Sequence, residues 1–231
     1  MTTLQREFVD YLQQWMEDLP HSELADMFPL PEKSAIISVD VINGFCTLGP
    51  LSSPRVKNII DPITELFNLA CNNGIQKILL IQDTHDPDAV EFGSYPPHCI
   101  RGTAEAETVP EFQELPYFSQ MTILEKNSIH SGINTGLNEW MAENPDISDF
   151  IVVGDCTDLC VYQLAMQLRL DANARQLMRR IVIPANCVDT YDLSVAAAAK
   201  AGAMPHDADL LHAIFLYHMA LNGILIVGSL K

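Results

Sequence analysis

Short apolar segments rich in β-branched residues alternate with segments of helical periodicity along most of the chain, and this alternation limits the possible folds. The apolar segments are nearly continuous, as expected for strands that are buried on both faces of a parallel sheet. Six are predicted as strands: Ala35–Val41, Lys77–Ile81, Thr122–Leu124, Phe150–Val153, Ile181–Ile183 and Ile224–Val227. Five are predicted as helices: Val56–Cys71, Thr135–Met141, Thr157–Leu170, Ser194–Ala201 and Asp207–Leu221. The pattern predicts a three-layer α/β/α sandwich with a central, mostly parallel six-stranded sheet.

The first 30 residues have a different pattern. Apolar residues recur there at helical spacing, which predicts an amphipathic helix over about residues 4–18. Three prolines follow this helix and break the chain: Pro20, Pro29 and Pro31. We therefore expect a helical appendage over residues 1–30 and one main domain over residues 31–231. The appendage is expected to pack on the domain or on a neighbouring subunit.

Charge and cysteine content exclude several classes of function. The formal net charge is −17, which disfavours binding to nucleic acids and to anionic membranes. No apolar run approaches the roughly 18 residues that a membrane span needs, and the N-terminus lacks the apolar segment of a signal peptide. The six cysteines form no C-x-x-C pair, so a zinc ribbon is not expected. We expect a cytoplasmic protein with reduced thiols.

Chemically active side chains follow four of the predicted strands. Asp40 ends the first strand, and Asp83 and His85 follow the second. Lys126 follows the third strand, and Cys160 lies in the first turn of the helix after the fourth. Because ligands bind beyond the carboxyl ends of parallel strands, we expect these side chains to converge on one edge of the sheet.

The predicted surroundings of Cys160 suit a nucleophile. Thr157 is predicted as the N-cap of the following helix, and both the helix N-terminus and the Lys126 ammonium would lower the pKa of the thiol below its usual ~8.5. Asp40 is positioned to accept the thiol proton. Backbone N–H groups of the Cys156–Cys160 loop would stabilise the oxyanion formed by attack on an amide. The alternative interpretation is a buried structural cysteine.

A second group of residues suits a metal ion. Asp83, His85, Glu91 and His98 supply nitrogen and oxygen donors, which fit a divalent ion such as Zn, Mn or Fe. Asp83 and His85 are two residues apart and so share one face of an extended segment. The alternative interpretation is a polar loop whose histidines are solvated or hydrogen-bonded.

Three motifs resemble those of the isochorismatase-like cysteine hydrolases, and within them the nicotinamidases, over about residues 34–229. They are V-D-V-I-N-G-F at 39–45, L-E-K-N-S-I-H-S-G at 124–132 and G-D-C-T-D-L-C-V at 154–161. The resemblance implies a Rossmann-like strand order, with Asp40, Lys126 and Cys160 as catalytic residues and Phe45 as a pocket aromatic. It also implies a cis peptide bond between Asp155 and Cys156, and oxyanion donors at the N–H groups of Cys156 and Cys160.

The nicotinamidase subgroup carries a metal ion that holds the pyridine nitrogen of the substrate, in the pattern D-x-H, a third ligand and W-P-x-H-C. This resemblance assigns the ligands to Asp83, His85, Glu91 and His98, with Glu91 where histidine is usual. Tyr95 stands where tryptophan is commoner and would stack on the substrate ring. The resemblance implies hydrolysis of nicotinamide to nicotinate and ammonia, a role in NAD salvage, and a homo-oligomer.

Other functions remain open at this point. A related amidohydrolase that acts on a ureido or carbamoyl compound would use Asp40, Lys126 and Cys160 without needing the metal. A scaffold protein that kept the fold would not need all three, and a redox sensor would use Cys156 and Cys160. Three histidines near the last predicted helix are interpreted as structural: His206, His212 and His218. Residues 189–191 are expected to shape the pocket.

Overall fold

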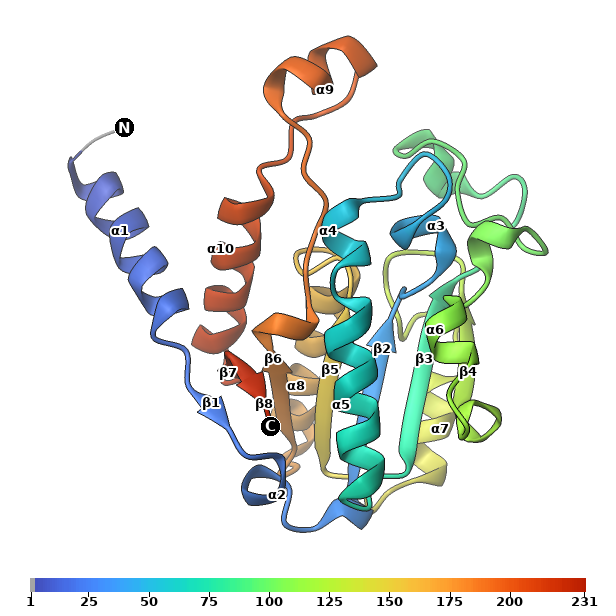
Figure 1. Ribbon diagram of the computed structural model, residues 1–231, viewed down its shortest axis with the longest axis vertical. Coiled ribbons are helices and arrows are strands. Elements are labelled where there is room, and N and C mark those ends of the chain that lie inside the picture. The colour runs from blue at the N-terminus through green and yellow to red at the C-terminus, as the bar shows by residue number, and fades with distance from the viewer. Residues whose placement is uncertain (1–2) are drawn as a thin grey trace.

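The computed structural model describes residues 3–231 and contains a six-stranded sheet in the order β4-β3-β2-β5-β6-β7 (Figure 1). Its strands are β2 (Ser34–Val39), β3 (Lys77–Asp83), β4 (Thr122–Lys126), β5 (Asp149–Gly154), β6 (Arg180–Pro184) and β7 (Leu225–Val227). Each pair of neighbouring strands is parallel. All six predicted strands are present, and the predicted fold class is confirmed.

Helices cover both faces of this sheet, as Figure 1 shows. One face packs against α5 (Ile60–Asn72) and α6 (Pro110–Gln113). The other packs against α7 (Leu137–Glu143), α8 (Cys160–Arg175) and α10 (Ala208–Leu221). The shorter helices are α2 (Leu24–Met27), α3 (Asn43–Cys46), α4 (Pro54–Lys57) and α9 (Val195–Ala201). Turns of 3₁₀ helix occur at Pro31–Lys33, Val90–Gly93, Ala104–Ala106, Phe118–Gln120 and Ala185–Cys187.

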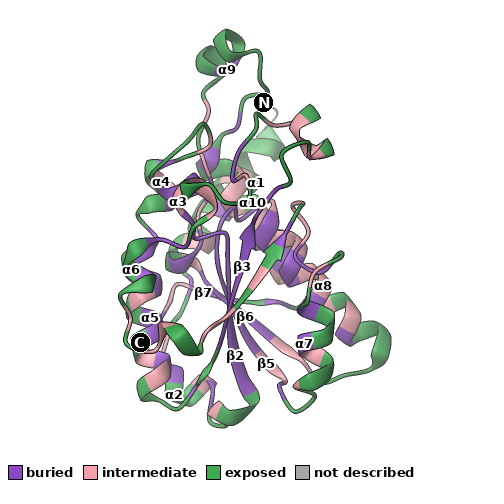
Figure 2. Cartoon of the chain, turned by 90° about the vertical axis from the view of Figure 1, so that its right-hand side faces the viewer, coloured by how far each residue is buried: buried purple, intermediate pink, exposed green. Residues whose placement is uncertain are grey.

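The position of β2 between two helical layers explains why its sequence is apolar at successive positions. Ile36 belongs to the apolar cluster on the α5 face, and its neighbour Ile37 belongs to the cluster on the α8 face. Successive side chains of a strand point to opposite faces, so a central strand between two helical layers needs apolar residues on both. Figure 2 shows the resulting buried sheet at the centre of the molecule. Each fully buried side chain of this size stabilises the fold by about 1.5–3 kcal/mol.

Two predicted helix boundaries are wrong. The predicted helix Val56–Cys71 is divided into α4 and α5, with a break after Lys57. Helix α8 begins at Cys160, so Thr157 is not its N-cap. The Thr157 hydroxyl instead forms a 2.8 Å hydrogen bond with Nδ1 of His212, a tertiary contact that local sequence does not reveal.

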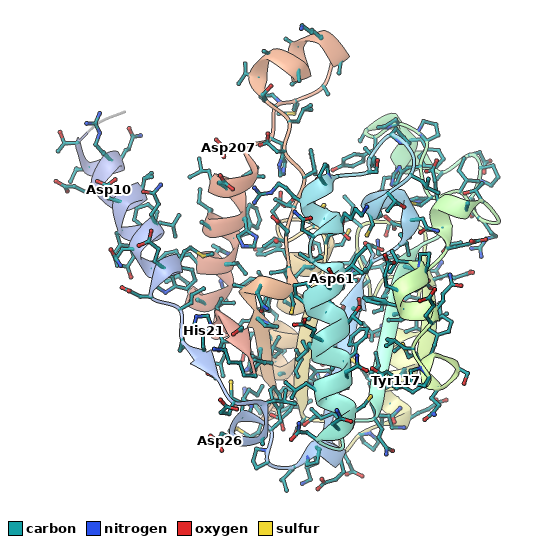
Figure 3. All side chains as sticks on the ribbon, in the orientation of Figure 1. Asp10, His21, Asp26, Asp61, Tyr117 and Asp207 are labelled. Atoms are coloured by element: carbon teal, nitrogen blue, oxygen red, sulfur yellow. The ribbon has the colours of Figure 1, made fainter. Side chains whose placement is uncertain are left out.

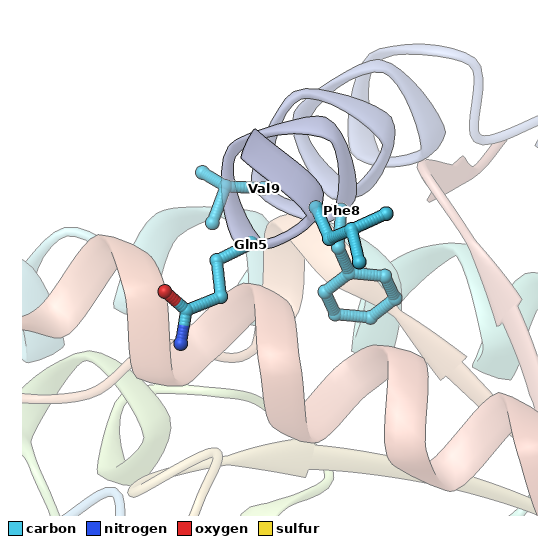
Figure 4. A pocket seen from close by; sticks show the side chains of 4 residues that line it. Gln5, Phe8 and Val9 are labelled. Carbon is cyan, nitrogen blue, oxygen red and sulfur yellow. The ribbon is translucent and has the colours of Figure 1, made fainter. Parts of the chain in front are cut away.

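The N-terminal helix α1 (Thr3–Glu17) packs beside α10, where Phe8, Tyr11 and Trp15 surround the ring of Tyr217. A hollow of about 640 Å³ lies on α1 itself and is lined by residues 4, 5, 8 and 9, away from the sheet edge discussed below (Figure 4). After α1, strand β1 (His21–Ser22) pairs in parallel with β8 (Ser229–Leu230). This two-stranded sheet was not predicted. Residues 1–2 of the expected appendage lie outside the described residues.

The acidic residues are dispersed over the surface. Asp10, Asp26, Asp61 and Asp207 are exposed and lie on or beside four different helices (Figure 3). Among the described helices, none combines the length and the apolar character that crossing a bilayer requires.

Candidate active site

The carboxyl ends of three neighbouring strands supply the predicted charged residues. Asp83 and Lys126 are the last residues of β3 and β4 and are register partners. Asp40 follows β2 directly and has a left-handed backbone conformation, with φ of 57°. Aspartate is one of the few non-glycine residues that adopt this region readily, because its short side chain can hydrogen-bond locally. Oδ1 of Asp40 accepts a 2.8 Å hydrogen bond from the backbone N–H of Asp83 at the end of the neighbouring strand.

The three predicted catalytic side chains meet at this edge. Nζ of Lys126 lies 2.8 Å from Oδ2 of Asp40 and 3.6 Å from Sγ of Cys160. The same ammonium donates a hydrogen bond to Oδ1 of Asp83. Donor atoms of Asp40, Asp83 and Cys160 lie within 4.8 Å of one another. All four side chains are buried, so their charges interact in a medium of low polarity.

Burial changes the proton affinities of this group. Burial, together with repulsion from Asp83, raises the pKa of Asp40 to about 7 even though the Lys126 ammonium opposes the change. Burial also raises the pKa of the Cys160 thiol well above its ordinary value, despite Lys126. The expectation of a lowered thiol pKa is therefore wrong, because desolvation outweighs the ammonium. Such a thiol needs a proton acceptor nearby, and a carboxylate oxygen of Asp40 lies within 4.8 Å of the Cys160 sulfur.

A sharp turn joins β5 to α8 and carries the nucleophile candidate. The peptide bond between Asp155 and Cys156 is cis, as the resemblance implies. Within the described chain, the backbone N–H groups of Cys156 and Cys160 donate no hydrogen bond to protein acceptors. Both remain available to a ligand, as the predicted oxyanion donors must be. We refer to residues 154–160 as the elbow.

A possible metal site adjoins the same carboxylates. Donor atoms of Asp83, His85 and His98, all buried, lie within 4.8 Å of one another. Nε2 of His85 lies 3.6 Å from Oδ1 of Asp83, and Nε2 of His98 lies 3.9 Å from Oδ2. Glu91 is half-buried at the edge of this cluster, with Oε1 3.9 Å from Nε2 of His85.

The histidine hydrogen bonds fit a divalent cation. Nδ1 of His98 lies 2.8 Å from the carbonyl of Pro96, and Nδ1 of His85 lies 3.1 Å from Oδ1 of Asn127. Both partners are acceptors, so in each neutral ring Nδ1 carries the hydrogen and Nε2 keeps a free lone pair. Nε2 of His85 is buried and has no hydrogen-bond partner. A cation bound between these nitrogens and Asp83 would supply the missing partner.

Aromatic rings surround His98. Phe45 and Tyr95, both predicted as substrate contacts, have ring centroids 5.7 and 6.2 Å from that of His98. Phe92 lies 5.7 Å from the same ring and was not predicted. Asn127 was also missed as the residue that orients His85, although it directly follows Lys126 in the sequence. A flat ring placed beside His98 would therefore meet apolar surface.

Comparison with known proteins shows the family of this chain. The sequence model described as "Isochorismatase domain" matches residues 34–211. The chain belongs to this family. It is 29% identical to nicotinamidase 1 of Arabidopsis thaliana over 85% of this chain and 86% of that protein. The predicted family is confirmed, and nicotinamidase relatives agree with the predicted enzyme class, an amidohydrolase.

Solved structures of the family share the fold. The pyrazinamidase of Pyrococcus horikoshii in complex with zinc superposes with a TM-score of 0.65 at 21% identity, over 84% of this chain and 98% of that one. The N-carbamoylsarcosine amidase of Thermoplasma acidophilum gives a TM-score of 0.62 at 21% identity, over 84% and 95%. The fold is thus common to amidases that act on different small amides.

Proposed function

We propose that this protein hydrolyses nicotinamide, or a close pyridine carboxamide, to the carboxylate and ammonia through a thioester at Cys160. One observation carries the proposal: the Lys126 ammonium contacts Asp40 and Cys160, while Asp83 links it to the histidines of the possible metal site. A nucleophile and a cation site for a ring nitrogen are thus next to each other. The similarity to a plant nicotinamidase supports the same substrate.

In the first half of the reaction, Asp40 takes the proton of the Cys160 thiol as sulfur attacks the amide carbon. The Lys126 ammonium limits the build-up of negative charge on both groups. The carbonyl oxygen becomes an oxyanion, for which the free N–H groups of Cys156 and Cys160 are the candidate donors. The C–N bond then breaks, Asp40 returns the proton to the leaving nitrogen, and ammonia departs. The acyl group remains on sulfur.

In the second half, water replaces ammonia beside Asp40. The carboxylate takes one proton from this water as its oxygen attacks the thioester carbon. The C–S bond breaks, the proton returns to sulfur, and the acid product leaves as its carboxylate with loss of one proton to solvent. In each catalytic cycle Asp40 therefore accepts a proton twice and donates a proton twice, which suits a carboxyl whose pKa is about 7.

Asp83, His85 and His98 would hold the metal ion, with Glu91 as the remaining predicted ligand. When bound, a divalent ion of this kind supplies a Lewis acid to which the ring nitrogen of a pyridine carboxamide can coordinate. The chain itself orients the ring through Phe45 and Tyr95. Burial of the cluster excludes most water from the acyl group.

The test is ammonia release from nicotinamide by the purified protein, with and without a chelator. We expect release that falls when the metal is removed and that is abolished by Cys160→Ala. Cys71→Ala is the matched control, because Cys71 is a half-buried thiol on α5, outside the site. Near-wild-type turnover by Cys160→Ala would exclude the thioester route. Turnover of ureido or carbamoyl amides alone, unaffected by chelator, would favour the alternative amidohydrolase.

A further inference from the structure

Asp158 lies in the elbow, two residues before Cys160. Both of its carboxylate oxygens form hydrogen bonds with residues outside the elbow. Oδ1 accepts a 2.6 Å hydrogen bond from the hydroxyl of Thr190. Oδ2 lies 2.8 Å from Nε2 of His206. Asp158 and His206 are both buried. The turn that carries the nucleophile is therefore attached to the segment that follows β6.

His206 stands at the base of a projecting arm. The chain leaves the body after Leu193, forms α9 and returns at His206, as Figure 1 shows at the top of the molecule. Leu193 and His206 close this arm with two backbone hydrogen bonds of 2.8 Å each. The ring of His206 stacks on Tyr191, with the centroids 3.9 Å apart. The arm closure thus fixes His206 between Tyr191 and the elbow.

Both nitrogens of the His206 ring have a hydrogen-bonding partner. Nδ1 lies 2.8 Å from the carbonyl oxygen of Tyr191, and Nε2 lies 2.8 Å from the carboxylate of Asp158. Both ring nitrogens are therefore within hydrogen-bonding distance of protein oxygens. The contact with Asp158 is a buried hydrogen bond to a carboxylate. Such bonds are stronger and geometrically stricter than neutral ones.

We propose that His206 is a positioning residue, which acts through Asp158 to hold the elbow in the geometry that catalysis requires. This inference rests on the proposed function of Cys160. The elbow supplies both the sulfur and the two free N–H groups, and a displacement of about 1 Å at such a site can cost on the order of 100-fold in rate.

The elbow should keep other hydrogen bonds to the rest of the domain when His206 is replaced. Thr157 donates a 3.0 Å backbone hydrogen bond to Asp189, and its hydroxyl contacts His212. These contacts do not involve His206. Variants at His206 are therefore expected to fold, with an elbow that is less strictly oriented.

The experiment compares His206→Ala and His206→Gln with His218→Ala and His218→Gln, where His218 is an exposed histidine on α10. We expect His206→Ala to lower kcat for nicotinamide roughly 10- to 100-fold, with a much smaller change in KM. His206→Gln should recover part of the loss, since its amide can still donate to Asp158. The His218 variants should behave as wild type. Equal kcat in the His206 and His218 variants would overturn the proposal.

A double-mutant cycle tests whether His206 acts through Asp158. The double variant Asp158→Asn/His206→Ala should be about as slow as the slower single variant, because the second change removes a contact that is already lost. Additive losses would mean that His206 acts by another route.

Labelling the cysteines with ¹⁵N gives a readout that needs no turnover. The amide signals of Cys156 and Cys160 should shift in His206→Ala while that of Cys71 stays in place. Unchanged signals at Cys156 and Cys160 would refute the positioning role, whatever the wild-type activity. Absence of ammonia release by the wild type would instead count against the proposed function alone.

Discussion

Nζ of Lys126 lies 2.8 Å from Oδ2 of Asp40 and also contacts Asp83, so one buried cation is the shared counter-ion of two buried carboxylates. Burial alone would lower the pKa of Lys126, but these two carboxylates raise it well above its usual value. Lys126→Met would leave like charges facing each other without a counter-ion. We expect Lys126→Met to lower the free energy of unfolding of the metal-free protein by about 3–5 kcal/mol and to abolish activity. Urea unfolding and ammonia release measure the two effects.

Lys77→Met is the matched control for this substitution. Lys77 begins β3, is exposed and makes no ion pair within the described chain. Its replacement should leave the urea midpoint and the turnover close to wild type. A Lys126→Met protein as stable as the Lys77→Met protein would show that Asp40 and Asp83 do not need the ammonium.

Asp40→Asn separates the chemistry of Asp40 from its backbone conformation. Asparagine tolerates the left-handed region, where Asp40 has φ of 57°, but cannot accept the thiol proton as a base. We expect thioester formation to slow by roughly 10²- to 10⁴-fold while stability changes little. Rapid-quench single-turnover measurements with the acyl-enzyme detected by mass spectrometry report this step directly. Asp40→Ala should be less stable than Asp40→Asn by about 1–2 kcal/mol, because alanine is strained at this φ.

The sequence predicted the sheet well because its strands are continuous apolar runs, but it did not predict where β2 ends. Val41 continues the apolar run Ala35–Val41, yet Asp40 turns the chain into the left-handed region after Val39. The start of α8 was misplaced for a related reason. Thr157 has the side chain of an N-cap, but its hydroxyl bonds to His212, which is 55 residues away. Local pattern cannot reveal a tertiary partner at that separation.

The predicted site residues came together because each follows a strand of the same parallel sheet. The direction of the Cys160 pKa could not be predicted in the same way, since it depends on how completely the thiol is buried. The contact between Asp158 and His206 joins residues that are 48 apart through an arm with no sequence signature. The family motif contains Asp158, but nothing in the motif indicates which histidine it meets.

Removal of one candidate ligand tests the metal site without reference to activity. His98→Ala deletes an Nε2 donor 3.9 Å from Asp83, and we expect the purified protein to lose most of its bound divalent ion. Plasma mass spectrometry of protein dialysed without chelator measures metal per chain, with His218→Ala as the control. Metal content that is unchanged in His98→Ala would remove His98 from the predicted ligand set.

Asn127→Ala tests how His85 is oriented toward that ion. The Asn127 amide accepts from Nδ1 of His85 at 3.1 Å and donates to Asp86 at 3.2 Å, which fixes its orientation. Without it His85 can rotate or change tautomer, so we expect metal affinity to weaken roughly 10- to 100-fold. Competition titration with a chromogenic chelator gives the dissociation constant. An affinity equal to that of the wild type would mean that His85 is oriented by other contacts.

Gly154→Ala tests the close approach of the elbow to β2. Gly154 has φ of 111°, and a Cβ at this position would lie 2.0 Å from the carbonyl oxygen of Val39. Both the backbone conformation and the contact exclude a side chain, so β5 or β2 would have to move at the point where Asp40 and the elbow begin. We expect a loss of stability of more than about 2 kcal/mol and a fall in kcat, measured by thermal unfolding and ammonia release. Gly93→Ala is the control, since Gly93 has ordinary φ and no atom within 4 Å of an added Cβ. If both variants unfold at the wild-type temperature, the strands do not approach each other as closely as the structure indicates.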